Sequence, residues 1–383
     1  MNGGTRLRVI AVAAVFAIAA ASCGGSSGTS SSNGLKVGFF GALTGSNSPQ
    51  LGINIRNGEK LAIDQYNKTA KTKVTLVEYD SQGDPAQAPQ LAQRAISDKV
   101  VALVGPAFSG ESKVADPIFE QAKIPNLTPS ATNAKRQLNG WKYFHRLLAN
   151  DDSQGPADAD YISMKLKAAK VAVIDDASEY GKGLADVVRQ KLGSAVTVTD
   201  SVDPKAAAGN YSSTVNKVNA GHVDAVFYGG YYADAGPLLK QLRDGQYKGA
   251  FESGDGSLDQ KLIDEAGATA AEGAYITCAC VLAGSSTNPA AQTFATDYKA
   301  AFSADPGTYS AEAFDGANAV LKAIAAGNTT GSAIDSYLTS IDFAGITKQI
   351  KFDPQGEVQG GGIYMYQVKN GKLTLLGDVK TLV

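Results

Sequence analysis

The chain has 383 residues, 44% of them hydrophobic and 19% charged, so its composition excludes wholesale disorder and its length suggests two domains. The 35 Lys and Arg residues against 37 Asp and Glu residues leave a formal charge of −2, which lacks the basic excess of a nucleic-acid-binding protein. The chain has two histidines, His145 and His222, and three cysteines, Cys23, Cys278 and Cys280. These are too few for a metal site rich in either residue, so we expect no metal and no cofactor.

The N-terminus carries the features of an export signal. Two arginines precede an apolar run over 9–21, which is too short to span a membrane and suits a signal peptide. Small residues then lead to Cys23, which resembles a bacterial lipobox, although ordinary cleavage beside an incidental cysteine is the alternative. We expect a lipoprotein signal peptide at 1–22, a lipidated Cys23 and a Gly/Ser tether over 23–34. The protein would then be anchored on the extracytoplasmic face of the cell membrane.

From residue 35 onward, short apolar runs typical of strands alternate with segments of helical periodicity. Before residue 150, we expect strands at 35–43, 72–80, 100–105 and 123–132, and helices at 52–68, 84–97 and 109–122. A β–α–β–α order predicts a parallel sheet covered by helices on both faces.

The alternation starts again after residue 151. We expect helices at 152–166, 180–192, 211–220, 234–244 and 258–267, and strands at 169–176, 195–203, 223–230, 249–256 and 274–281. Three further helices are expected at 289–302, 310–327 and 332–341. The tail over 347–377 alternates with a period of two between turn residues, which predicts antiparallel strands.

Ligands of open α/β sheets bind beyond the carboxyl ends of the strands. Six loops are expected there: GALTGSNSPQLG, GPAFSG, TPSATN, DDASEYG, YGGYYAD and ESGDGS. They carry small residues, hydroxyls, aromatic rings and acids, and neither histidine lies in them. The G-x-S-x-G, Walker A and dinucleotide-binding patterns are also absent from their proper contexts, so we do not expect an enzyme.

Several fragments occur in a fixed order after the lipobox: KVGFFGALTG, YDSQGDP, LVGPAFSGES, IPNLTPSAT, DDSQGP, EYGKGLA and FYGGYYADAGPLLKQ. Together they resemble the Leu/Ile/Val-binding proteins, the type I periplasmic receptors of branched-chain amino-acid ABC importers. The resemblance implies an α/β fold of two doubly wound lobes with mainly parallel sheets, joined by three crossover segments around a ligand cleft. It implies a first lobe at 35–148 and 283–343, and a second at 149–282 and 344–383.

The resemblance also implies which residues grip the polar end of an amino acid. Ser109 matches the serine that binds the α-carboxylate. Ser130 and Thr132 match the pair that holds the ligand backbone, with the Ser130 carbonyl toward the ammonium and Thr132 toward the carboxylate. Asp255 matches an acid of the second lobe that pairs with the ammonium, at a position where the family often has Glu.

Other matching positions would surround the ligand. Tyr180 and Tyr231 match aromatic residues that close over it from the second lobe. Leu51 and Tyr309 match first-lobe positions near the ligand side chain, and Leu51 stands where an aromatic residue is common. Ala107 and Phe108 would line the same pocket.

Taken singly, these residues have ordinary structural explanations, since a hydroxyl after a strand is usually a helix cap and a Gly-flanked Asp is usually a turn residue. Taken together at strand ends, they supply donors for a carboxylate, an acid for an ammonium and an apolar wall for an aliphatic side chain.

Cys278 and Cys280 lie two residues apart, on one face of a regular strand. In an exported chain a disulfide is favoured over free thiols. The resemblance places the pair at the second lobe crossover, where a disulfide would stiffen the hinge or have no role in ligand binding.

We therefore expect a monomeric, lipid-anchored receptor that binds a branched-chain amino acid and delivers it to an ABC permease. One alternative is a ligand sensor with the same fold, and another is a receptor for an amide, urea or an aromatic amino acid. An acid facing the ammonium favours an amino acid over a neutral amide.

Overall fold

The computed structural model describes Met1 and residues 34–135 and 140–383. Three predicted features lie outside the described residues: the signal peptide after Met1, the lipidated Cys23, and the tether up to residue 33. Residues 34–383 form one unit, and none of the helices described in it is long and apolar enough to cross a membrane.

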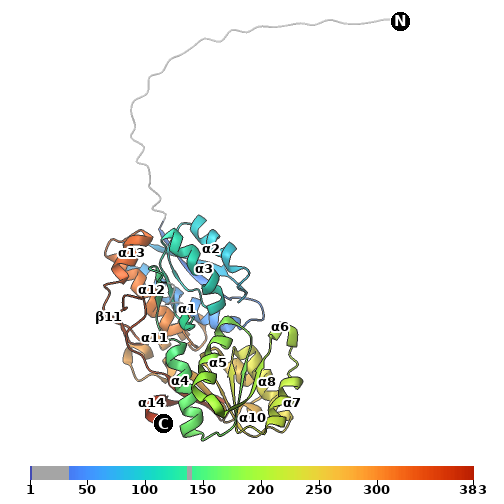
Figure 1. The fold of residues 1–383 in the computed structure, drawn as a ribbon. Coiled ribbons are helices and arrows are strands. Elements are labelled where there is room, and N and C mark those ends of the chain that lie inside the picture. Colours follow the sequence, from blue (N-terminus) through green and yellow to red (C-terminus); the bar gives the residue numbers. More distant parts are fainter. Residues whose placement is uncertain (2–33, 136–139) are drawn as a thin grey trace, which may run out of the picture. The chain divides into compact units, whose positions relative to one another are not determined.

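The first sheet is entirely parallel, with strand order β2–β1–β3–β4–β5. Successive residues of a strand point to opposite faces, so Phe39 and Phe40 of β1 enter two separate cores. The core of Phe40 and Phe119 contains side chains of α2 and α3, and the core of Phe39 contains side chains of α1 and α12. The strands are β1 (Leu35–Gly41), β2 (Val74–Asp80), β3 (Val100–Val104), β4 (Asn126–Thr128) and β5 (Phe144–Arg146). The helices of this lobe (Figure 1) are α1 (Pro49–Thr69), α2 (Ala88–Ser97), α3 (Ser109–Ala122), α11 (Pro289–Phe302), α12 (Ser310–Ala325) and α13 (Gly331–Leu338).

The second sheet has the order β14–β13–β10–β9–β8–β6–β7. The strands β6 to β10 are parallel, and β13 and β14 add to β10 as an antiparallel hairpin. The hairpin turns at Asn370 and Gly371, which have φ of 53° and 70°, as a tight Asn-Gly turn requires. The strands are β6 (Val171–Asp175), β7 (Val196–Ser201), β8 (Ala225–Gly229), β9 (Ala250–Ser253), β10 (Tyr275–Cys278), β13 (Tyr364–Lys369) and β14 (Lys372–Asp378).

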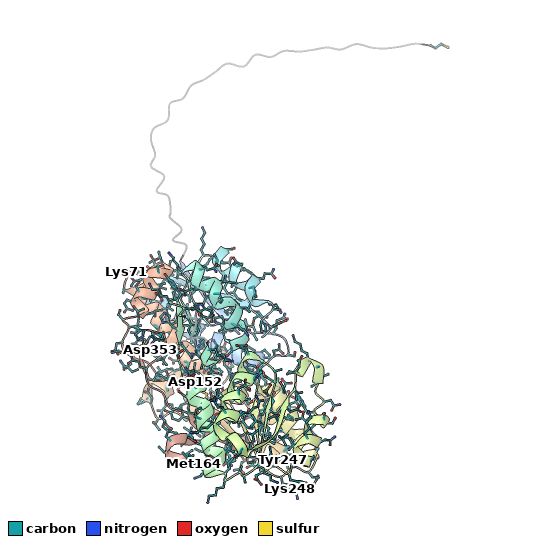
Figure 2. The ribbon with its side chains drawn as sticks, in the orientation of Figure 1. Lys71, Asp152, Met164, Tyr247, Lys248 and Asp353 are labelled. Carbon is teal, nitrogen blue, oxygen red and sulfur yellow. A yellow bond between two sulfur atoms is a disulfide. The ribbon has the colours of Figure 1, made fainter. Side chains whose placement is uncertain are left out.

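The helices of the second lobe (Figure 1) are α4 (Asp151–Asp160), α5 (Glu179–Leu192), α6 (Pro204–Ala207), α7 (Ser212–Gly221), α8 (Tyr232–Asp244), α9 (Gln260–Ala266), α10 (Ala268–Ala271) and α14 (Val379–Leu382). The helix predicted over 152–166 is split, because α4 continues as the π-helix η2 (Tyr161–Lys165). Met164 of this turn is 55% exposed, and Lys71, Asp152 and Lys248 are exposed charged residues elsewhere on the surface (Figure 2). The predicted α/β class, with two lobes and mainly parallel sheets, is confirmed.

A segment near the C-terminus bonds to the first lobe. It contains the short antiparallel pair β11 (Phe343–Ala344) and β12 (Gln349–Ile350). The backbone N–H groups of Ile346 and Thr347 donate to Asp315 of α12, and Glu357 bridges to Arg146 of β5. The lobe division remains a prediction, and these bonds favour moving its last boundary from 344 to about residue 359.

The second crossover leaves β10 at Cys278. The structure joins Cys278 and Cys280 by a disulfide, with the Cα atoms 4.9 Å apart. The Tyr366 hydroxyl accepts a hydrogen bond from the backbone N–H of Leu282 at 2.8 Å. The crossover is therefore fastened to the sheet of the second lobe on both sides of Val281.

Candidate functional site

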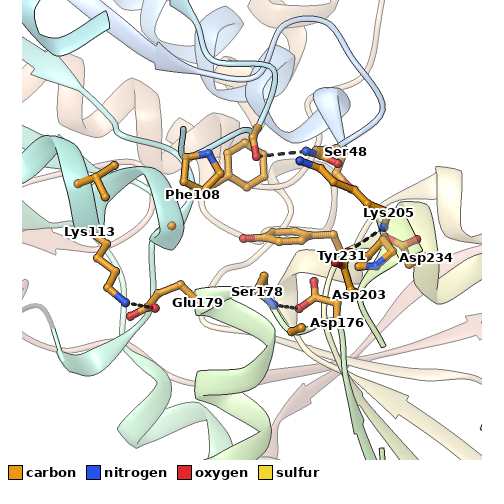
Figure 3. Close-up of a pocket in the computed structure, with 17 residues that line it drawn as sticks. Ser48, Phe108, Lys113, Asp176, Ser178, Glu179, Asp203, Lys205, Tyr231 and Asp234 are labelled. Atoms are coloured by element: carbon orange, nitrogen blue, oxygen red, sulfur yellow. Dashed lines mark hydrogen bonds and ion pairs between the residues drawn. The ribbon is translucent and has the colours of Figure 1, made fainter. Parts of the chain in front are cut away.

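The six loops predicted at the strand ends all contribute to two adjoining cavities between the sheets. The inner cavity has a volume of about 10 Å³, and its lining is Leu51, Ala107, Phe108, Ser130, Tyr180, Tyr231, Gly256 and Tyr309. The outer cavity has a volume of about 580 Å³ and includes Asn47, Gly110, Asp176 and Asp234 in its lining. Phe108 and Tyr231 line both cavities (Figure 3).

Asp255 lies behind the inner cavity, in the 3-10 turn η4 (Asp255–Ser257) that follows β9. Its side chain is fully buried, and the Tyr180 hydroxyl donates to Oδ1 at 2.5 Å. Burial raises the pKa of Asp255, against hydrogen bonds from Tyr180, Tyr309 and Gln154 that lower it. Within the described residues, Asp255 has no Lys, Arg or His nitrogen within 4.0 Å, so a ligand cation would find an unpaired acid there.

The predicted hydroxyl groups lie on the first lobe, at the start of α3 and in the loop after β4. The Ser130 hydroxyl donates to the Ala107 carbonyl at 2.6 Å, which ties the two loops together. The Ser109 hydroxyl accepts from the backbone N–H of Asn133 at 3.3 Å. Thr132 is fully buried, and its hydroxyl lies beside the carboxyl of Asp151. The three hydroxyls therefore lie on two loops that are joined by hydrogen bonds.

Aromatic rings wall the inner cavity. The Tyr231 ring lies between Tyr180 and Phe108, with centroid distances of 5.1 and 5.2 Å. Burial raises the pKa of the tyrosine hydroxyls of Tyr180, Tyr231 and Tyr309, so these groups stay protonated donors at neutral pH. Tyr309 has φ of 67°, a conformation that costs a bulky residue about 1–3 kcal/mol and is common at binding sites.

Sequence reasoning missed Asp151, the first residue of α4. It is 2% exposed, and burial together with the neighbouring Asp255 raises its pKa to about 7. Its backbone N–H donates to the Thr132 carbonyl at 3.0 Å. An acid in the first turn of a helix usually interacts with the helix dipole, so only its place in DDSQGP could have marked it. Gly256, which lines the inner cavity beside Asp255, was also missed.

Arg146 holds the loop that carries Thr132. Its guanidinium is fully buried and donates to the carbonyls of Ala131 and Asn133 at 3.0 and 3.1 Å. It also pairs with Glu357 at 3.1 Å. The Arg146 side chain thus links β5, which precedes the first crossover, to the loop that carries Thr132 and to the segment of Glu357, which precedes the third crossover.

Several bonds cross between the lobes, which stand closed. The Tyr232 hydroxyl accepts from the backbone N–H of Gln50 at 3.0 Å. The Asn133 amide donates to the Glu179 carbonyl at 2.8 Å, and Lys113 pairs with the Glu179 carboxylate at 2.8 Å (Figure 3). In this closed arrangement the inner cavity has room for about one water molecule. An amino acid could therefore enter only when the lobes part.

The ten predicted site residues are thus placed in two groups. Seven line the inner cavity: Leu51, Ala107, Phe108, Ser130, Tyr180, Tyr231 and Tyr309. Ser109, Thr132 and Asp255 are not part of this lining: Ser109 bonds to Asn133, Thr132 lies beside Asp151, and only Asp255 bonds to a lining residue, Tyr180. In the residues that the structure describes, no cluster of three His, Cys, Asp or Glu side chains is arranged to hold a metal.

The sequence profile described as "Periplasmic binding protein" matches residues 34–372, which is most of the chain. The chain belongs to the periplasmic binding protein family. This membership confirms the resemblance found in the ordered fragments, and the family is one of substrate-binding receptors.

Curated relatives of this periplasmic binding protein include the leucine-specific-binding protein of Salmonella typhimurium, 33% identical over 249 residues. That match covers 63% of this chain and 66% of the relative, so just under two thirds of the relative is spanned. The Leu/Ile/Val-binding protein of Escherichia coli is 31% identical over 249 residues, with 63% and 67% covered.

Solved structures support the same family. The isoleucine complex of a branched-chain amino acid transporter substrate binding protein from Streptococcus pneumoniae has a TM-score of 0.82 and 28% identity. It covers 90% of this chain and 99% of its own. A leucine binding protein from Thermotoga maritima has a TM-score of 0.81 and 26% identity, with 89% and 97% covered.

Proposed function

We propose that this periplasmic binding protein is an extracytoplasmic receptor that binds a branched-chain amino acid in the inner cavity and delivers it to an ABC permease. The observation that carries the proposal is the pair of buried acids, Asp255 and Asp151, which interact with each other. Among the described residues neither acid has a Lys, Arg or His nitrogen within 4.0 Å, although Arg146 is near enough to lower the pKa of Asp151. Two buried carboxyls are costly unless a positive group compensates them, and the ammonium of an amino acid is such a group.

The rest of the site complements the other parts of an amino acid. Ser109 and Thr132 would donate to the α-carboxylate, and the Ser130 carbonyl would accept from the ammonium. Tyr180 would orient Asp255, and Tyr231 would close over the ligand from the second lobe. Leu51, Ala107 and Tyr309 would provide an apolar wall that suits an aliphatic side chain.

The relatives that bind leucine, isoleucine and valine support the branched-chain assignment. A receptor for an amide, urea or an aromatic amino acid is the alternative within transport, and a sensor of the same fold is the alternative outside it. A neutral amide would leave the two acids uncompensated, which favours an amino acid. An enzyme is not favoured, because His145 is bound to the buried Asp335 of α13, away from both cavities.

Delivery to a permease is favoured over sensing by the predicted anchor. A lipidated Cys23 with a Gly/Ser tether over 23–34 would keep a monomeric receptor within reach of a membrane partner. Lobe motion about the crossovers would then release the ligand at the permease, as part of an open–closed equilibrium that the ligand shifts by its preference for the closed form.

A thermal-shift screen of residues 24–383 against the twenty amino acids, urea and short amides tests this function. A ligand at about 100 times its dissociation constant adds roughly 2.7 kcal/mol to the free energy of unfolding. We expect leucine, isoleucine or valine to raise the melting temperature most. Stabilisation by urea or an amide alone would contradict the proposal.

A further inference from the structure

A contact between two aromatic rings separates the inner cavity from the outer one. Phe108 comes from the first lobe, at the start of α3, and Tyr231 from the second lobe, at the start of α8. Their rings meet edge to face, with centroids 5.2 Å apart. Figure 3 shows the Tyr231 ring next to the Phe108 ring in the lining of the outer cavity. We call this contact the aromatic gate.

Each ring of the gate is held by its own lobe. The backbone N–H of Phe108 donates to Oε2 of Glu111 at 3.3 Å, and its carbonyl accepts from Ser112 at 3.0 Å. Phe108 is 6% exposed. The Tyr231 ring packs on Tyr180, whose hydroxyl is bonded to Asp255. The gate therefore opens and closes with the lobes and lies one ring away from the acid that would hold the ligand ammonium.

The two cavities differ greatly in the room that they offer. The inner cavity holds about 10 Å³, so a ligand side chain must displace part of its lining. The outer cavity holds about 580 Å³, which lies within the usual range of ligand sites, roughly 300–1,000 Å³. Phe108 and Tyr231 line both cavities, so a ligand whose polar end is fixed at Asp255 would reach the outer volume past these two rings.

We propose that Phe108 is a specificity-determining residue, which limits the ligand to a small aliphatic side chain by closing the outer cavity. The part of the outer cavity next to the gate, bounded by Pro85, Val114 and the two rings, is then a latent subsite for aromatic side chains, while charged side chains such as Asp176 and Lys205 line the rest of that cavity. This inference rests on the proposed amino-acid binding. Loss of the Phe108 ring joins the two volumes, while Asp255, Ser109 and Thr132 keep their places.

The test measures dissociation constants of L-leucine and L-phenylalanine by calorimetry for the full chain and three variants. In Phe108→Ala we expect the ratio of the two constants to shift toward phenylalanine by about tenfold or more, the size of effect expected for rebuilding an apolar pocket. Phe108→Val, which removes less volume, should shift the ratio in the same direction. Phe108→Val also replaces Phe108→Ala in this test if the alanine variant does not fold. Val114→Ala, which enlarges only the outer cavity, should leave the ratio unchanged.

The results separate this inference from the function on which it rests. If the unaltered chain binds leucine and both Phe108 variants keep its ratio, the gate does not set specificity and the inference is wrong, while the proposed function stands. Preference of the unaltered chain for phenylalanine would also overturn the inference and leave amino-acid binding intact. If the unaltered chain binds no amino acid, both the proposed function and this inference are wrong.

Discussion

The hydroxyl of Tyr180 donates a hydrogen bond of 2.5 Å to the carboxylate of Asp255, which lies 75 residues further along the chain. The same hydroxyl accepts from the backbone N–H of Gly256 at 3.0 Å. Tyr180 lies in the first turn of α5, which follows β6, and Asp255 follows β9, so two strand ends of one sheet meet at this bond. The acid is thereby fixed in orientation before any ligand arrives, which is the condition for selective binding of an ammonium.

Replacement of Asp255 by Asn tests the ammonium site. We expect Asp255→Asn to weaken leucine binding by about 2–5 kcal/mol, because a buried ammonium would lose its charged partner. Asp264→Asn is the matched control, since Asp264 lies on the exposed side of α9 in the same lobe, and its affinity should be unchanged. Calorimetric titration of both variants measures the effect. Wild-type affinity in Asp255→Asn would place the ligand elsewhere, with the outer cavity as the first candidate.

The affinity for leucine should fall as the pH falls. Burial raises the pKa of Asp151 to about 7, so this acid takes up a proton as the pH falls below neutral, and burial raises the pKa of Asp255 as well. An ammonium favours the ionised carboxyls, so ligand binding releases protons and is opposed below pH 7. We expect the dissociation constant to rise by up to about tenfold per pH unit between pH 7 and pH 5. A constant affinity across this range would show that Asp151 does not face the ligand charge.

The stability of the ligand-free protein should change in the opposite direction. Burial raises the pKa of Glu111, Asp151, Asp176 and Glu312 to about 7. Where the folded pKa of an acid exceeds its unfolded value, the folded state binds more protons, and the free energy of unfolding decreases with rising pH. Urea unfolding should therefore give a lower midpoint at pH 7 than at pH 5. A midpoint that increases steadily over this interval would mean that these acids are ionised in the fold.

Anchoring depends on Cys23, which lies outside the described residues. We expect the protein to sediment with membranes, and Cys23→Ala to be released into the soluble fraction, because lipid chains on the cysteine supply the membrane affinity. Mass spectrometry of the mature N-terminus provides the independent measurement. An unmodified N-terminus at any other residue would rule out the lipid anchor.

The order of helices and strands could be read from the sequence because apolar periodicity is a local property. Phe39 and Phe40 of β1 are an example, since the two rings are buried in separate cores on opposite faces of the sheet. The rule that strand ends in a parallel sheet lie at one edge predicted the loops that carry Ser109, Tyr180 and Asp255. The three residues themselves were assigned by the resemblance to the Leu/Ile/Val-binding proteins, and their role in binding stays a prediction. The split of α4 at the π-helix could not be predicted, because helical periodicity continues through it.

Long-range packing explains what the sequence could not provide. Arg146 looks like a surface cation, yet it is fully buried because carbonyls of the Thr132 loop and Glu357 surround it. Asp151 looks like a helix-start acid, and only the fold brings it to Asp255. The small volume of the inner cavity depends on how Phe108 and Tyr231 meet across the lobes, which no local pattern determines.

Calorimetric titration of the chain with L-leucine and then with D-leucine tests most directly whether the buried acids and hydroxyls grip an amino acid. Asp255, the first-lobe hydroxyls and the apolar wall of the inner cavity would hold the ammonium, the carboxylate and the side chain at three separate points, which only one enantiomer can satisfy. We predict saturable binding of L-leucine at one site per chain and no detectable binding of D-leucine at the same concentrations. Equal affinity for the two enantiomers, or no heat with either, would contradict the account.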